Sequence, residues 1–304
     1  MPSKISRREF VTAGLAATTM VTMLGSKTVL AAGYPDIIEV KGQAEAAVRS
    51  AVDALGGIKR FVSKGSVVTI KPNMGFGTEP LQAATTDPAV VSTLAKMCLE
   101  AGAKKVLIFD NPCHRPELVL EKNGIKQACS KLTDTFVYII QDSKFFVDVT
   151  FPKGIKMTKA RVAKDLLESD VIIAAPAAKS HGGAIVTFTA KGWMGVVERR
   201  QMMHLVGLHQ TIADLASFVK PHLVVLDATK ALVTGGPGGP GKVLQLNKVI
   251  AGIDQIAIDA YAVKLAQWEG KTLTPADIPY IQIATSMGVG RSDLEKLKII
   301  TKTV

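Results

Sequence analysis

Several apolar runs in this 304-residue chain end in side chains that can carry charge or transfer protons. The clearest case is AAPAAKSHGGAIVTFTAKG, where Lys179, His181 and Lys191 follow or interrupt apolar residues. A lysine is costly to bury as a cation unless a carboxylate or an anionic ligand accompanies it. Histidine adds a group that exchanges protons near neutral pH. These three side chains are therefore the candidate catalytic residues.

Three further apolar runs end in the same way. VVTIKPN ends in Lys71 and Asn73, VLIFDNP contains Asp110, and LVVLDA contains Asp227. Ligands of open α/β sheets bind beyond the carboxyl ends of the strands, so we expect these four side chains to bind a ligand beside the catalytic group. In the alternative interpretation, each lies on an exposed strand end with its polar group in water. For Lys191 the alternative is a lysine that protects an edge strand.

Histidines and one cysteine raise the question of a metal ion. His204 and His209 are five residues apart, about 140° around a regular helix, so they do not share a helix face. If His204 precedes the helix, it can turn inward toward His181 and an aspartate, in a mixed site. Cys113 lies on a strand-end loop beside His114. The candidate metal ligands are thus His181, His204, His209 and Cys113, and the alternative is that all four are structural.

Cysteine usage limits the cofactors that this chain can hold. Cys98, Cys113 and Cys129 cannot all pair, and no two form a C-x-x-C motif. Three thiolates are too few for a four-cysteine cluster. We therefore expect either a metal ion or, only if another chain shares the ligands, an iron–sulfur cluster.

The glycine-rich stretch TGGPGGPGKV contains G-x-x-x-x-G-K between Gly236 and Lys242. Val243 stands where a phosphate loop needs Ser or Thr, and Pro237 and Pro240 lack the N–H groups of a phosphate cradle. We expect a mobile loop beside the site instead of a nucleotide clamp.

Alternating β-branched and amphipathic segments must position these side chains. Strands are predicted over residues 36–40, 66–72, 104–110, 136–142, 170–176, 222–228, 247–253 and 296–302. Helices are predicted over residues 43–55, 88–101, 163–168, 208–219, 256–268 and 279–287. This pattern is typical of an α/β fold with a largely parallel sheet covered by helices. The charged stretch 150–162 suggests two α/β lobes, residues 33–150 and 151–304, with a crevice between them; one continuous sheet with an excursion is the alternative.

The first 32 residues have the layout of an export signal. Arg7 and Arg8 precede a moderately apolar run, and small residues follow at Ala31 and Ala32. This order is typical of a twin-arginine signal, and the run is too short for a permanent membrane span. The alternatives are a general secretory signal and an uncleaved amphipathic arm. We expect a periplasmic or extracellular protein.

Charge and composition narrow the partners. The formal net charge is +11, and 47% of the residues are hydrophobic, so a globular, basic protein is expected. The basic residues are scattered without interleaved aromatics, which argues against nucleic acid. An anionic small molecule or an acidic redox partner protein fits better, and the sequence leaves a homo-oligomer open.

The order and spacing of these segments resemble a known family. VVTIKPN, TTDPAVVSTLAKMCLEAGAKKVLIFDNP, SDVIIAAPAAKSHGGAIVTFTAKGWMG, the GGPGGPGK loop and GIDQIAIDAYA are similar to the domain-of-unknown-function 362 family. The resemblance runs from about residue 36 to the end. It implies motif positions at Lys71, Asn73, Asp87, Asp110, Lys179, His181, Lys191, Asp227, Asp254 and Asp259. Members are associated with ferredoxin-type modules in anaerobic bacteria, whereas this chain has no cysteine-rich segment.

Two functions of different class remain. The first is an exported, redox-associated enzyme or cofactor-bearing accessory of an anaerobic bacterium, with an anion- and metal-binding site at the strand ends. The second is a periplasmic binding protein that holds an anionic solute without catalysis.

Overall fold

The computed structural model describes residues 33–304, of which Tyr34–Val304 form a compact unit. The predicted export signal, residues 1–32, lies outside the described residues. The strands are β1 (Ile37–Lys41), β2 (Val67–Pro72), β3 (Lys105–Asp110), β4 (Thr135–Ile139), β5 (Phe146–Thr150), β6 (Lys159–Ala163), β7 (Val171–Ala175), β8 (Ala177–His181), β9 (Ile185–Thr187), β10 (Leu223–Leu232), β11 (Val243–Gly252) and β12 (Ile299–Thr303). The α-helices are α2 (Ala44–Ala54), α3 (Pro88–Glu100), α4 (Pro116–Lys122), α5 (Ile125–Ala128), α6 (Lys164–Glu168), α7 (Thr189–Gly192), α8 (Gln201–Phe218), α9 (Gln255–Ala262) and α10 (Pro279–Ser286).

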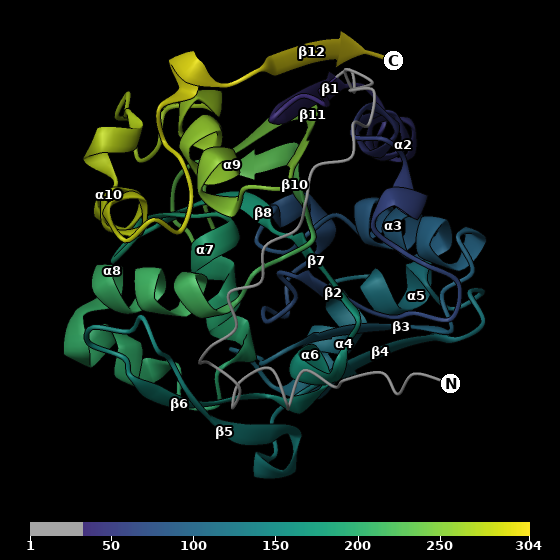
Figure 1. The fold of residues 1–304 in the computed structure, drawn as a ribbon, viewed down its shortest axis with the longest axis horizontal. Helices are drawn as coiled ribbons and strands as arrows, with labels where there is room; N and C mark the ends of the chain where they lie inside the picture. Colours follow the sequence, from purple (N-terminus) through teal and green to yellow (C-terminus); the bar gives the residue numbers. More distant parts are fainter. Residues whose placement is uncertain (1–32) are drawn as a thin grey trace, which may run out of the picture. The chain divides into compact units, whose positions relative to one another are not determined.

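One large, mostly parallel sheet organises the unit (Figure 1). Its strands follow the order β12-β1-β11-β10-β7-β2-β3-β4. The five strands from β10 to β4 are parallel neighbours, whereas β11 runs antiparallel to both β1 and β10. The hairpin β8–β9 continues from β7 and pairs with β10 through β8. The predicted α/β class with a largely parallel sheet is confirmed.

Neighbouring residues of each central strand pack into different cores. Ile172 and Ala174 of β7 belong to the core beneath α7, α8, α9 and α10, whereas Val171 and Ile173 belong to the core beneath α2, α3 and α5. Figure 1 shows these two groups of helices on opposite sides of the sheet. Because successive strand side chains point to opposite faces, burial on both faces explains the continuous apolar runs in the sequence.

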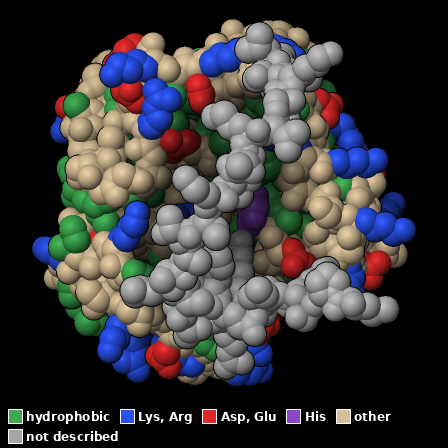
Figure 2. All heavy atoms as spheres, viewed as in Figure 1, with side chains coloured by type: hydrophobic (Ala, Val, Ile, Leu, Met, Phe, Trp, Pro, Cys, Tyr) green, Lys and Arg blue, Asp and Glu red, His purple; other side chains and the backbone are tan. Residues whose placement is uncertain are grey.

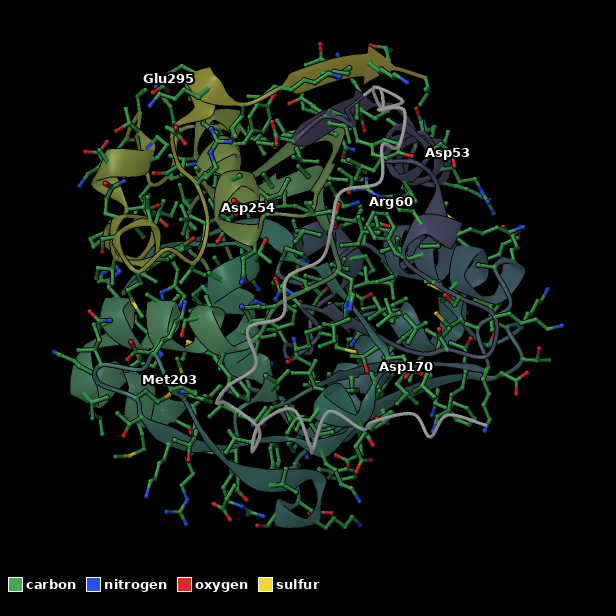
Figure 3. The ribbon with its side chains drawn as sticks, in the orientation of Figure 1. Asp53, Arg60, Asp170, Met203, Asp254 and Glu295 are labelled. Atoms are coloured by element: carbon green, nitrogen blue, oxygen red, sulfur yellow. The ribbon has the colours of Figure 1, made fainter. Side chains whose placement is uncertain are left out.

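Local signals fix the helix starts that the sequence predicts. Asp87 caps α3 by accepting a hydrogen bond from Ala89 N at 2.9 Å, Pro88 occupies the first helical position, and Gly102 stops the helix with φ +90°. Asp254, labelled in Figure 3, caps α9 by accepting the N–H groups of Ile256 and Ala257.

The division into two lobes at residue 150 needs correction. Strands on both sides of this boundary are hydrogen-bonded neighbours, because β2 pairs with β7 from Val68 to Pro72. The stretch around residue 150 forms a separate two-stranded sheet, β5–β6. The charged stretch is therefore an excursion from one continuous sheet, as in the alternative interpretation.

Two further properties concern the surface. Within residues 33–304, no helix combines the length and the apolar composition needed to cross a membrane. Lys and Arg side chains are distributed around the visible face in Figure 2 and do not gather in one continuous patch there.

Candidate functional site

The hairpin β8–β9 places two of the predicted catalytic residues. Its register pairs Lys179 with Thr187 and His181 with Ile185. Directly opposite residues of an antiparallel pair project to the same face, and so do residues two apart on one strand. Lys179, His181 and Thr187 therefore share one face of the hairpin.

That face lines a pocket of about 280 Å³, close to the lower limit of about 300 Å³ for typical small-molecule sites. The lining residues are Asn73, Gly75, Phe76, Asp110, Asn111, Cys113, Lys179, His181, Thr187, Lys191, Gly192, Met194, Gly195, Arg200, His204 and Pro237. The pocket thus unites side chains that lie up to 164 positions apart in the chain. It contains most of the predicted site residues.

A buried ion pair lies at the floor of the pocket, which Asp110 lines and the predicted ligand-binding residue Lys71 does not. Lys71 Nζ lies 2.9 Å from Asp110 Oδ1, and both side chains are almost fully buried. Asp110 also accepts hydrogen bonds from Met74 N and Asn111 N at 2.9 and 3.0 Å. Gly195 permits this arrangement, because a Cβ there would overlap the Asp110 carboxylate. Lys71 and Asp110 neutralise each other, and the Asp110 oxygens are occupied.

Lys179 differs from Lys71 in lacking a counter-ion. Its side chain is 1% exposed, and within residues 33–304 no carboxylate lies within salt-bridge distance of it. Its ammonium group donates to the Ala84 carbonyl and lies 4.7 Å from the centroid of the Phe76 ring. Burial, together with the nearby charge of Lys191, lowers the pKa of Lys179 to about 7. The neutral amine is therefore well populated at neutral pH.

His181 is held in one tautomer by the turn that follows it. Its Nδ1 accepts the N–H groups of Gly183 and Ala184 at 3.0 and 2.9 Å. A nitrogen that accepts two hydrogen bonds carries no proton, so the neutral ring carries its proton on Nε2. Burial, then the charge of Lys191, lowers the pKa of His181 to about 3. The ring therefore offers the pocket a neutral N–H donor.

Lys191 reaches the pocket from a helix. The strand β9 ends at Thr187, and α7 begins at Thr189 because the Asp259 carboxylate accepts the N–H groups of Thr189 and Ala190 at 2.7 and 3.0 Å. Lys191 therefore lies in a helix and not in an edge strand, and it lines the same pocket as His181. Burial lowers the pKa of Lys191 to about 8, and within residues 33–304 no carboxylate forms a salt bridge with it.

Asn73 and Arg200 build two walls of the pocket. Asn73 Oδ1 accepts the Ala177 N–H at 3.0 Å, which ties β2 to the start of β8. Arg200 donates to the carbonyls of Asn111 and Pro112, and its Nη2 lies 3.3 Å from Cys113 Sγ. Arg200 therefore fixes the loop that follows β3 while bringing a positive charge to the pocket.

Asp227 does not line the pocket, contrary to the prediction. It lies in the middle of the ten-residue strand β10, where it accepts the Asp87 N–H at 2.7 Å and both the N–H and the hydroxyl of Thr229. Burial raises its pKa to about 6. Its carboxylate supports the start of α3, where Asp87 pairs with Lys230 at 2.6 Å. The apolar run stops at Asp227, but the strand continues.

Three of the predicted metal ligands, Cys113, His181 and His204, line the pocket, whereas His209 does not. Within the part of the chain that the structure describes, no group of three or more His, Cys, Asp or Glu side chains could hold a metal ion. Gly207, with φ +121°, interrupts α8 between His204 and His209. His204 faces the pocket, 6.0 Å from His181 between ring centroids, whereas His209 lies against Tyr280, 6.5 Å away. Cys113 contacts Arg200 instead of a histidine.

A second cavity lies next to the start of α8. Its volume is about 570 Å³, and it is lined by Ser143, Lys156, Met157, Thr158, Lys159, Ala160, Arg161, Val197, Glu198, Arg199, Met202, Met203 and Val206. Met203 is labelled in Figure 3. This cavity is larger, but it holds none of the side chains that follow the central strands. The smaller pocket is therefore the candidate site.

The glycine-rich loop lies beside the pocket as predicted. Pro237 lines it, and a Cβ on Gly238 would lie 2.8 Å from the Phe76 ring. The loop is anchored, because Glu269 accepts the Gly235 N–H at 2.9 Å and Ser180 Oγ accepts the Gly236 N–H at 3.0 Å.

Sequence reasoning missed three residues that shape the pocket. Thr187 was given no role, Arg200 belongs to an arginine doublet that does not show which member turns inward, and Gly195 ends the motif KGWMG. The close glycines of that motif were the one usable signal, because a glycine permits close backbone approach.

This chain is similar to a protein-family model and to a known protein. The family model described as domain of unknown function (DUF362) matches residues 68–264. A thylakoid-associated protein of Synechocystis sp. is 26% identical over 265 residues, which cover 84% of this chain and 78% of that protein.

Two solved structures show a weaker similarity to this chain. The lactate racemase apoprotein of Thermoanaerobacterium thermosaccharolyticum gives a TM-score of 0.45 at 15% identity, over 71% of this chain and 54% of that chain. A Thermotoga maritima protein gives 0.40 at 14% identity, over 61% and 51%. The chain thus spans about half the length of these two structures. The family model alone covers well over half of the 304 residues, and the chain belongs to the DUF362 family.

Proposed function

We propose that the pocket binds a small anionic molecule and that the protein is an enzyme acting on it. The observation that carries this proposal is the imbalance of charge in the pocket. Lys71 forms a salt bridge with the Asp110 carboxylate. Within residues 33–304, no carboxylate forms a salt bridge with Lys179, Lys191 or Arg200. Lys179 is buried, and Lys191 and Arg200 are partly buried. A buried cation without a partner is costly, and an anionic ligand supplies the missing charge.

Catalysis is supported by the shifted acid–base properties of the same side chains. The lowered pKa values of Lys179 and Lys191, about 7 and about 8, allow each amine to exist in both protonation states near neutral pH. Such shifts concentrate at catalytic sites. His181 supplies a neutral Nε2–H donor, suited to an oxygen that gains negative charge during reaction.

The test is a calorimetric titration of the full chain with phosphate, sulfate and pyruvate, first as isolated and then after dialysis. We expect at least one of these anions to bind, and Lys191→Met to weaken its binding about tenfold or more because a buried charge pair is lost. Lys126→Met, which removes an exposed lysine outside the pocket, should bind like the parent. Equal affinities of all three proteins would contradict the proposal.

A binding protein without catalysis is the second candidate. It is favoured by Asp110, because the only carboxylate that lines the pocket within the described residues has its oxygens occupied and is no free base. Ligand recovered unchanged after long incubation, followed by NMR, would favour this candidate. Conversion of the ligand would favour the enzyme.

We further propose that the protein is exported by the twin-arginine route and then binds an acidic redox partner protein. Arg7, Arg8 and the apolar run that follows support export, and the basic net charge supports the partner. Replacing both arginines with lysine should leave the protein in the cytoplasm, as cell fractionation would show; unchanged export would exclude the route.

A further inference from the structure

The pocket contains a buried hydroxyl without a hydrogen-bond partner among the described residues, on the strand opposite Lys179. Thr187 is 3% exposed and lines the pocket, and its Oγ1 has no hydrogen-bond partner within residues 33–304. A buried hydroxyl without a partner costs about 1–3 kcal/mol. A ligand oxygen in the pocket would supply that partner.

The hairpin register brings this hydroxyl to Lys179. The two residues face each other across β8 and β9, where opposite Cβ atoms are about 4.5–5.5 Å apart. Lys179 has no carboxylate partner among the described residues. The register thus places the Lys179 and Thr187 side chains on the same wall of the pocket.

The amine has the properties of a nucleophile. Burial and the nearby Lys191 lower the pKa of Lys179 to about 7, so a large fraction carries the lone pair that attack on a carbonyl carbon requires. A lysine that is desolvated and next to another cationic group is a recognised arrangement for imine formation. Lys191 remains as the cation for an anionic substituent of the same ligand.

We propose that the ligand class is the small 2-oxo acids and that Lys179 forms an imine with their carbonyl carbon. The ligand carboxylate pairs with Lys191, and the Thr187 hydroxyl hydrogen-bonds the carbonyl oxygen. This inference rests on the proposed anion-binding function and names its substrate class. The pocket volume of about 280 Å³ suits a ligand of this size.

The step balances without a further reactant. The Lys179 nitrogen forms a bond to the carbonyl carbon, and the carbonyl oxygen takes up a proton to give a carbinolamine. That hydroxyl group then leaves with a second proton as water, and a carbon–nitrogen double bond remains. The amine loses both of its protons, no electron is gained or lost, and the products are one imine and one water.

The test uses the full chain incubated with pyruvate and then reduced with borohydride, which makes an imine permanent. Peptide mass spectrometry should find one reduced pyruvate group, on Lys179. Propionate has the carboxylate without the carbonyl, and acetone has the carbonyl without the carboxylate; neither should give this adduct at the same concentration. Lys126→Met should be labelled like the parent, and Lys179→Met should not be labelled.

Two outcomes separate this inference from the proposed function. Calorimetric binding of pyruvate without an adduct on Lys179 would overturn the imine but leave anion binding intact. Absence of binding by every anion, together with absence of an adduct, would overturn both. An adduct on another lysine would also overturn the assignment to Lys179.

Thr187→Val tests the hydroxyl separately, because valine keeps the shape and removes the polar atom. We expect the rate of adduct formation to fall about tenfold, the effect of one lost hydrogen bond to a reacting group, while thermal stability stays equal or rises. An unchanged rate would exclude the role of Thr187.

Discussion

Lys71 and Lys179 each lie in a strand beside the same pocket, but their surroundings give them opposite properties. Lys71 has a carboxylate at 2.9 Å, whereas the Lys179 ammonium group donates to a carbonyl oxygen, lies against an aromatic ring and forms no salt bridge with a described carboxylate. A buried ion pair keeps its charge through its partner. A buried amine without a partner loses its proton more readily. One residue type thus supplies both a fixed cation and a neutral amine.

This difference predicts how stability depends on pH. The pKa of Lys179 is about 7 when folded and 10.5 in its ordinary state, so the unfolded chain binds more protons between these values and stability rises with pH across this window. Below pH 7 the folded protein carries the full free-energy cost of burying the charged Lys179 ammonium group. Lys179→Met should therefore be more stable than the parent at pH 6 by a few kcal/mol, and the difference should vanish near pH 10.

Urea unfolding at pH 6, 8 and 10 measures this effect. Lys71→Met is the matched control with the opposite sign, because it leaves the Asp110 carboxylate buried without its cation and should destabilise the protein at pH 6 and at pH 8. Parallel pH profiles for the parent and Lys179→Met would contradict the assignment.

For single residues, the sequence predicted which side chains lie at the pocket better than it predicted what each side chain does there. Lys71, Asn73, Asp110, Lys179 and His181 were predicted from one rule, that polar residues after parallel strands meet. The rule failed for Asp227, because β10 continues five residues beyond it. Nothing in the sequence shows that Lys71, and not Lys179, receives the Asp110 carboxylate, since that choice depends on the register between β2 and β3.

Short elements hold the site in ways that the sequence does not reveal. The stretch IVTFTAKG has the β-branched residues of a strand, yet α7 begins inside it because Asp259, 70 positions away from Thr189, caps its first N–H groups. Tyr280 donates to the same carboxylate at 3.2 Å. A cap supplied from a distant segment overrides local propensity. Gly207 acts in another way, because its φ of +121° interrupts α8 between His204 and His209.

The element that follows α7 gives a prediction about the ion pair. In the 3-10 helix Trp193–Val196, a Cβ on Gly195 would overlap Asp110 Oδ1 and lie 2.8 Å from Lys71 Nζ. Gly195→Ala must therefore displace either the backbone or the pair, and we expect a loss of about 2–4 kcal/mol of stability together with loss of anion binding.

Gly182→Ala is the control, because nothing lies within 4 Å of a Cβ at that position in the turn between β8 and β9. It should unfold at the same temperature as the parent and bind the same anions. Thermal unfolding and calorimetry of both variants test this. A Gly195→Ala protein with unchanged binding would mean that the ion pair does not shape the pocket.

At the scale of the whole described unit, most of the framework was predictable. Each of the eight predicted strands overlaps an observed strand, and each of the six predicted helices overlaps an observed helix. Apolar continuity predicted them because burial on both faces requires it. The hairpin β8–β9 was missed because its strands are short and partly polar, and the two-lobe division was wrong because composition does not report strand pairing.

The edge of the sheet provides a prediction that leaves the pocket untouched. β12 covers β1 through parallel pairing from Ile37 to Lys41. A chain ending at residue 296 should lose several kcal/mol and aggregate, because β1 would expose unpaired N–H and C=O groups. The fraction that stays folded should still bind ligand, since no pocket residue lies in β1 or β12. Light scattering and calorimetry measure both. A chain lacking only Val304 keeps β12 and should remain soluble.

The origin of the pocket walls has a consequence for biosynthesis. The floor comes from β2 and β3, one wall from β8 and β9, another from the start of α8, and Pro237 closes a side. The first half of the polypeptide therefore supplies the Lys71–Asp110 pair and the loops after β2 and β3, but none of the unpaired cations Lys179, Lys191 and Arg200. Residue 237 has to emerge and dock before the pocket is complete, so the first half of the polypeptide cannot hold the ligand by itself.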